Sequence, residues 1–274
     1  MKLKIEIDNE KSIVKEIDDS GVEKTKEVLT EDLLNALSEN EIQFESPTLP
    51  GPYGVRKFVK KGNSTYYLFL EQPREVELQY SLYDYEDNYH ELYDSMDDVY
   101  SILDEYDITI ENNDTGQEVM KVPTVLPNTV WMVKVTESST GVYYEKMKVF
   151  AMDGPAISGH EELSRFPFSN IYEDGQICWG NVTLSSPSVQ AIQGLSTRFL
   201  GTLFNLDLYY NVQDIDTDYG TYNDTMVVHS KISKNYSTPE EKLNALSEYF
   251  LTYHGRNGDV ATLDDEFESF VRQY

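Results

Sequence analysis

One cysteine, Cys178, is all that the 274-residue chain contains, so an internal disulfide and a paired-cysteine zinc site are excluded. A protein without disulfides is expected in a reducing cytoplasm. No stretch approaches the roughly 20 apolar residues that span a bilayer. The first ten residues, MKLKIEIDNE, lack the apolar core of a signal peptide and predict a strand instead. We therefore predict a cytoplasmic globular protein with no membrane partner.

Positive charge is also scarce. The chain has 22 Lys and Arg against 49 Asp and Glu, which gives a formal net charge of −27. Such a field repels phosphate backbones and anionic lipid, so no nucleic-acid partner is expected. It fits docking onto a basic protein. The hydrophobic share of 39% and aromatic share of 12% provide enough apolar material for a packed core.

The motifs of common cofactor sites are missing. There is no GxxxxGK[ST] phosphate loop, and no GxGxxG follows a strand. The four histidines are too scattered to predict a zinc site: His90, His160, His229 and His254. We therefore expect neither a cofactor nor a metal. Carboxylates are so abundant that no single pair of them indicates acid–base catalysis.

The first 72 residues read as a mixed α/β region. The stretch KLKIEI alternates charged and apolar side chains, as a half-buried strand does. Thr30 leads into LLNALSEN, a predicted short helix with acids in its first turn. Two further strands are expected around the turn Lys61-Gly62-Asn63. We place the end of this N-terminal region at residue 72.

Residues 73–120 form an acidic, tyrosine-rich stretch, in which no Lys or Arg occurs between Arg74 and Lys121. Five apolar or aromatic residues recur in it at helical spacing, which predicts a helical connection with one packed face. The alternative is an acidic docking surface for a basic partner. The five residues are Met96, Val99, Tyr100, Leu103 and Tyr106.

Residues 121–215 begin as β structure. The stretches NTVWMVKVTE and GVYYEKMKVFAM predict two strands, joined by a hairpin turn at 138–141. After the cysteine, Ser186 and Pro187 have the pattern of a helix start. Residues 216–274 are predicted as a helical tail. Its two helices start at the capping box Thr238-Pro239-Glu240-Glu241 and near Thr262.

The cysteine lies in the segment FPFSNIYEDGQICWGN, residues 166–181. A lone cysteine is often an inert core residue. The glycines and polar residues around Cys178 favour an accessible thiol on a loop instead. One interpretation pairs it with His160, the histidine nearest before it in sequence, as in a cysteine hydrolase.

The same segment resembles the active-site segment of ubiquitin-conjugating enzymes. Asn170, Ile171, Gly175, Ile177 and Cys178 stand at the offsets of that family's Asn-to-Cys motif. It resembles more closely a divergent bacterial branch, the PRTRC system protein B type, over roughly residues 120–215. The residues that fit this branch are Pro167, Asn170, Ile171, Asp174, Gly175, Cys178 and Gly180.

The resemblance implies an α+β fold, an antiparallel β-meander with flanking helices, as the core over 121–215. It implies an acyl transferase in which Cys178 carries a ubiquitin-like modifier as a thioester and passes it to an amine. Asn170 would donate to the oxyanion or hold the loop in shape. The implied partners are a ubiquitin-like modifier and an adenylating, activating-type enzyme.

The neighbours of Cys178 complete the expected site. Gly175 is expected to adopt a positive φ, and Trp179 to pack beside the thiol or contact the modifier's tail. Asp174 and Phe168 are the other expected binding residues, and Glu173 and Asp174 are candidates for the base that takes the amine's proton. Two departures stand out, because Phe168-Ser169 replaces the family's His-Pro and Trp179-Gly180 replaces its Leu-Asp. A catalytically inactive scaffold of the same fold is the alternative.

Overall fold

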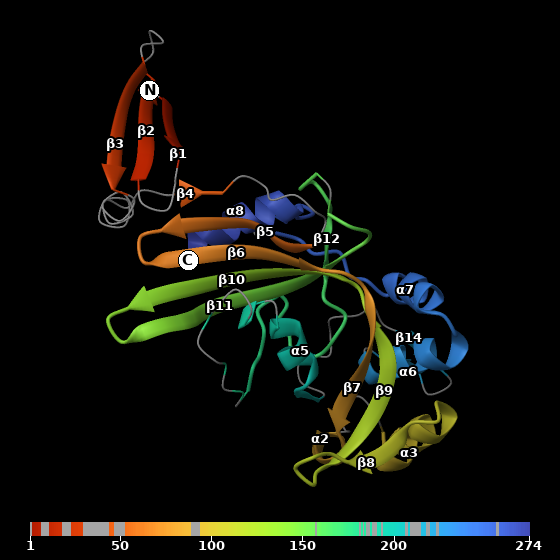
Figure 1. Cartoon of the computed structure of the whole chain (residues 1–274). Helices are drawn as coiled ribbons and strands as arrows, with labels where there is room; N and C mark the ends of the chain where they lie inside the picture. The colour runs from red at the N-terminus through yellow and green to blue at the C-terminus, as the bar shows by residue number, and fades with distance from the viewer. Residues whose placement is uncertain are drawn as a thin grey trace.

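The computed structural model shows a mixed α+β protein with antiparallel sheets and several helices (Figure 1). The antiparallel sheets and flanking helices agree with the predicted fold class. The structure describes residues 2–6, 11–17, 23–29, 44–46, 53–88, 94–156, 158–180, 182, 184, 187, 191–192, 194–205, 208, 215–217, 220–222, 225–255 and 258–274. The predicted helix after Thr30 and the predicted cap at Ser186 lie outside these residues.

The central sheet has six strands in the order β12-β11-β10-β6-β5-β4, and every neighbouring pair is antiparallel. Both predicted turns are confirmed, at residues 61–64 and 138–141. The two strands predicted around residues 61–63 therefore share one sheet with the two predicted for the core. The six strands of this sheet are β4 Phe44–Glu45, β5 Gly54–Lys61, β6 Ser64–Glu71, β10 Asn128–Ser138, β11 Gly141–Met152 and β12 Leu163–Arg165.

A second sheet has the order β13-β7-β9-β8 and lies beside helices α2 and α3 (Figure 1). The stretch predicted as a helical connection thus holds strands as well as helices. In β7 the side chains of Val76, Leu78 and Tyr80 alternate with exposed or half-buried polar ones, a period of two that the acidic composition obscures. The bounds are β7 Arg74–Ser81, α2 Leu82–Asn88, α3 Met96–Glu105, β8 Thr109–Asn112, β9 Glu118–Leu126 and β13 Leu203–Phe204.

The remaining elements lie at the two ends of the chain and after the cysteine. β1 Lys2–Glu6, β2 Lys11–Ile17 and β3 Glu23–Leu29 form an antiparallel sheet, which confirms the predicted first strand. The others are α5 Leu195–Leu200, β14 Ile215–Thr217, β15 Gly220–Tyr222, α6 Thr225–Asn235, α7 Pro239–Ser247 and α8 Leu263–Gln273.

Both faces of the central sheet are buried. Along β10, Trp131 and Val133 belong to one core cluster, and Val130 and Met132 belong to the other. Because side chains alternate along a strand, a strand that is covered on both faces reads as a continuous apolar run. Helix α8 belongs to the cluster on one face, whereas α5 and the cysteine segment belong to the cluster on the other, which also includes α6 where it packs on β9.

The helices of the tail match the prediction in two of three cases. Thr238 caps α7 through a capping box with Glu241, and Thr262 caps α8 by accepting from the N–H of Asp265. Helix α6 was not predicted. Residues 225–230 of α6 are all buried, so its sequence lacks the one-sided apolar pattern of an amphipathic helix. No helix in the described ranges is long and apolar enough to cross a bilayer.

Candidate functional site

A short β-hairpin, residues 171–177, ends at the cysteine. Ile171 pairs with Ile177, and the Tyr172 N–H donates to the Gln176 carbonyl at 2.8 Å. At the base of the hairpin the Cys178 N–H donates to the Asn170 carbonyl at 2.8 Å. The structure therefore brings the two predicted catalytic residues together through their backbones. Cys178 stands eight positions after Asn170 because the seven residues of the hairpin lie between them.

The hairpin lies along β11. The Val149 N–H donates to the Gly175 carbonyl at 2.9 Å, and the Ile177 N–H donates to the Met147 carbonyl at 3.3 Å. Gly175 has the expected positive φ, 82°. A Cβ atom at this position would lie 2.5 Å from Cε1 of Phe150. Gly175 is thus required both by its backbone conformation and by the ring beneath it.

Asn170 supports the loop in this structure. Its φ is 64°, a left-handed conformation that asparagine adopts more readily than most residues. Its side-chain nitrogen donates to the Leu203 carbonyl in β13 at 2.9 Å. This bond fixes the base of the hairpin to the strand that follows α5. It uses one of the two amide hydrogens, so donation to an oxyanion stays a prediction for the other.

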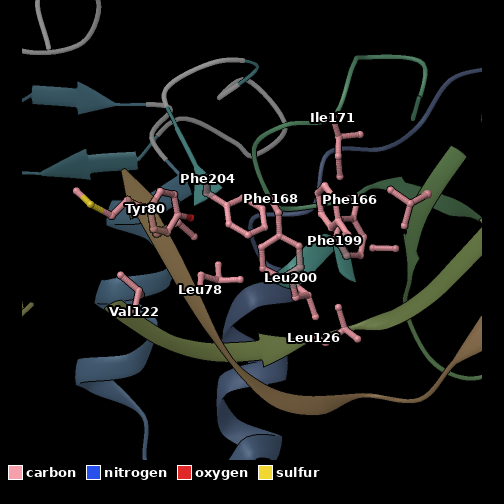
Figure 2. Close-up of a cluster of buried hydrophobic side chains, with 14 of the residues drawn as sticks. Leu78, Tyr80, Val122, Leu126, Phe166, Phe168, Ile171, Phe199, Leu200 and Phe204 are labelled. Atoms are coloured by element: carbon pink, nitrogen blue, oxygen red, sulfur yellow. The ribbon is translucent and has the colours of Figure 1, made fainter. Parts of the chain in front are cut away.

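Phe168 is fully buried, at 0% exposure, in the cluster that Figure 2 shows. Its ring lies 4.6 Å from that of Phe166 and 6.1 Å from that of Phe204, centroid to centroid. The aromatic packing therefore explains why an apolar residue stands here, and Phe168 has no exposed surface for its predicted binding role. Ser169 is also fully buried, and its Oγ has no hydrogen-bond partner among the described residues.

His229 of α6 contacts this loop from the core side, and no local motif predicts that contact. Its ring stacks on Phe168 at 4.7 Å between centroids. Nε2 lies 2.7 Å from the Pro167 carbonyl and therefore carries the proton, and Nδ1 lies 2.8 Å from Oγ1 of Thr124 and accepts from it. Burial lowers the pKa of His229 to about 4, although the Pro167 carbonyl opposes the shift. The ring is therefore neutral at pH 7.

Trp179 follows Cys178 in the chain and packs against the main core cluster, and Cys178 is a free cysteine of intermediate exposure. The Trp179 ring meets that of Phe199 edge to face at 5.9 Å. Its Nε1 is buried and has no hydrogen-bond partner in the described part of the chain. Core packing of Trp179 is therefore present, whereas packing against the thiol and contact with a modifier stay predictions.

Helix α5, which carries Phe199, is fixed to the central sheet by a half-buried carboxylate. Glu71 at the end of β6 accepts from Oγ of Ser196 at 2.5 Å and from Nε1 of Trp131 at 3.0 Å. Burial raises the pKa of Glu71, and the two donors and Arg74 oppose that shift. The helix whose Phe199 packs on Trp179 is thus attached to the sheet by directional bonds.

Both carboxylates of the hairpin turn have basic partners. Glu173 pairs with Arg165 at 2.9 Å, and Asp174 lies 3.7 Å from Nζ of Lys148. Oδ1 of Asp174 also accepts from the Gln176 N–H at 3.0 Å. The predicted binding residue Asp174 therefore shapes the turn, and a role of either acid as a base stays a prediction.

His160, the partner in the hydrolase interpretation, is exposed in the loop before β12, and its N–H donates to Oγ of Ser158 at 3.2 Å. Within the residues that the structure describes, no interaction joins His160 to Cys178, and no group of three or more His, Cys, Asp or Glu side chains could hold a metal ion.

A comparison with known families decides the affiliation of this site. The family model described as prokaryotic E2 family D matches residues 99–246, more than half of the chain, and the match includes the hairpin and Cys178. The chain belongs to prokaryotic E2 family D. No curated protein and no solved structure matches it significantly.

Membership in family D implies a ubiquitin-conjugating-like core, and in general a ubiquitin-like modifier and an activating-type enzyme as partners. The matched residues begin within α3 and end within α7. This range is wider than the core predicted over 121–215. It takes in α6, which supplies His229 to the back of the cysteine segment.

Proposed function

We propose that this family D protein carries a ubiquitin-like modifier as a thioester on Cys178 and transfers it to an amine. The observation that carries the proposal is the position of Cys178. The chain's one cysteine lies partly exposed at the base of a hairpin, within the residues that match an E2 family. A thiol held on ordered backbone suits acyl transfer, because the reacting atoms must meet in a defined geometry.

The chemistry consists of two acyl transfers. The Cys178 thiolate attacks the thioester carbonyl that joins the modifier to its activating enzyme, a new C–S bond forms, and the enzyme's thiolate leaves. An amine then attacks the Cys178 thioester, a C–N bond forms, Cys178 leaves as the thiolate, and the amine's proton passes to a base. Covalent catalysis of this kind divides one difficult transfer into two easier ones.

The surrounding residues have distinct parts in this proposal. Asn170 holds the base of the hairpin through Leu203, and in this proposal its second amide hydrogen donates to the oxyanion. Trp179 forms the wall along which the tail of the modifier reaches the thiol. The finer assignment to the PRTRC system protein B type is supported by Pro167, Asp174 and Gly180 beside the shared motif.

The test combines the protein with its candidate modifier, the activating enzyme and ATP. Wild-type protein should form an adduct that a thiol reductant cleaves. Cys178→Ser should form an oxyester that resists the reductant and is cleaved by hydroxide, and Cys178→Ala should form no adduct.

The matched control is His160→Ala, which should form the thioester at the wild-type rate. If the protein were a cysteine hydrolase, the same variant would lose its hydrolytic activity. Absence of any adduct on wild-type protein, with a modifier shown to be loaded on its activating enzyme, would overturn the proposal.

A further inference from the structure

Lys148 in β11 is a buried lysine that joins two segments distant in sequence. Its Nζ lies 3.1 Å from Oε1 of Glu266 in α8 and 3.7 Å from Oδ2 of Asp174 in the hairpin turn. Lys148 and Glu266 are each only 4% exposed. Because an unpaired charge in the interior is very unfavourable, each holds the other in place. The hydroxyl of Tyr253 also donates to Oε1 of Glu266, at 3.3 Å.

The turn above Lys148 is fixed by contacts from the same strand. Gly175 lies on the ring of Phe150, which in turn packs 4.5 Å from the ring of Tyr253. Nζ of Lys146 donates to Oε1 of Gln176 at 3.1 Å. Two successive lysines on this face of β11 therefore bind side chains of the hairpin. Only Lys148 connects the hairpin to a buried acid on α8.

We propose that Lys148 is a positioning residue for Cys178, and that Glu266 of α8 supplies the counter-charge that keeps its amine under the turn. The proposal rests on the proposed function of Cys178. It adds to that function an element that lies outside the residues matched by the family model, which end at 246, whereas α8 spans 263–273. Helix α8 is thereby part of the working site.

Lys134 provides a matched control on the neighbouring strand β10. It is 6% exposed, and its Nζ donates to Oε1 of Glu145 at 2.7 Å and to the Tyr274 carbonyl at 2.6 Å. In the described part of the chain neither partner belongs to the hairpin. Lys134→Met therefore removes a similarly buried lysine whose partners lie outside the turn.

The experiment measures the rate at which Cys178, the sole cysteine, reacts with a small maleimide across a range of pH. The plateau at high pH reports access to the thiolate, and the midpoint reports nearby charge. Lys148→Met and Glu266→Gln should each raise the plateau on the order of tenfold, because the hairpin opens locally more often. Lys134→Met should stay within about twofold of wild type, and Lys148→Arg should restore most of the wild-type plateau.

All rates are measured at a temperature at which circular dichroism shows that the variants are folded. If Lys148→Met does not fold, the isosteric Glu266→Gln takes its place in the comparison. Equal plateaus for Lys148→Met, Glu266→Gln and Lys134→Met would overturn the proposal. In the loading reaction, Lys148→Met should lower kcat on the order of tenfold and leave KM within about twofold. If wild-type protein accepts no modifier, the proposed function fails, yet the maleimide rates still decide the role of Lys148.

Discussion

The titration of His229 yields a prediction with a definite size. The folded protein protonates this ring only near pH 4, whereas the unfolded chain protonates it near the ordinary value of 6.5. Stability from the neutral ring is therefore fully present above pH 6.5 and is lost as the pH falls toward 4. At 1.36 kcal/mol per pKa unit, lowering the pH from about 7.5 to about 5 should remove about 2 kcal/mol of unfolding free energy.

The cause of this shift is structural. His229 is fully buried, stacks on Phe168, and is hydrogen-bonded at both nitrogens. The carbonyl of Pro167 already receives the Nε2 proton, so a second proton must enter at Nδ1, where the ring now accepts from the Thr124 hydroxyl. Protonation would break that bond and place a positive charge in an apolar cluster.

Urea denaturation of wild-type protein and His229→Gln at several pH values between 5 and 7.5 measures the effect. The many carboxylates titrate in both proteins, so the difference between the two isolates His229. The stability advantage of wild type should shrink by about 2 kcal/mol over this range. NMR titration of the His229 ring, assigned by its absence from the variant, checks the pKa directly. A constant stability difference, or a ring that titrates near 6.5, would refute the reasoning.

Three further predictions concern the hairpin and can be read by urea denaturation. Gly175→Ala should lower the free energy of unfolding by about 2–4 kcal/mol, because its Cβ would meet the Phe150 ring at a positive φ. Gly180→Ala also has a positive φ but open space around its Cβ, so it should lower the free energy of unfolding by about 1 kcal/mol. Equal losses in the two variants would contradict the proposed contact. Asn170→Ala should cost about 1–2 kcal/mol through loss of the bond to Leu203, and a stability equal to wild type would show that the bond contributes nothing. Trp179→Phe should change stability by less than about 1 kcal/mol, because the indole N–H has no partner to lose, while Trp179→Ala should cost about 3 kcal/mol through the lost packing on Phe199.

The turn before Cys178 was predictable from sequence because its information is local, whereas the pairing of the two arms into a hairpin was not predicted. Asp174-Gly175 is a turn signal, and Asn170 and Cys178 stand at the two ends of the segment that it closes. The strands β10 and β11 and the caps at Thr238 and Thr262 were predictable for the same reason. Each depends on residues within a few positions of one another.

The remaining features depend on contacts between distant segments. The side chain of Asn170 binds a carbonyl 33 residues later, and His229 binds one 62 residues earlier. Helix α6 shows no amphipathic pattern because residues 225–230 are all buried, and the strand pattern of β7 is obscured by its acids. No window of sequence contains such pairs, so periodicity and turn chemistry could not reveal them.

The closed hairpin also has a consequence for recognising distant relatives of this chain. Because the Asn170 carbonyl and the Cys178 N–H meet only when the intervening turn has its present length, one inserted residue would turn the side chain after it to the opposite face. The number of residues between Asn170 and Cys178 is thus under a tighter geometric constraint than the identity of most of them. A chain with a different motif but the same hairpin length would present its thiol from the same place. Distant relatives are therefore better recognised by that length than by the identities of the residues within it.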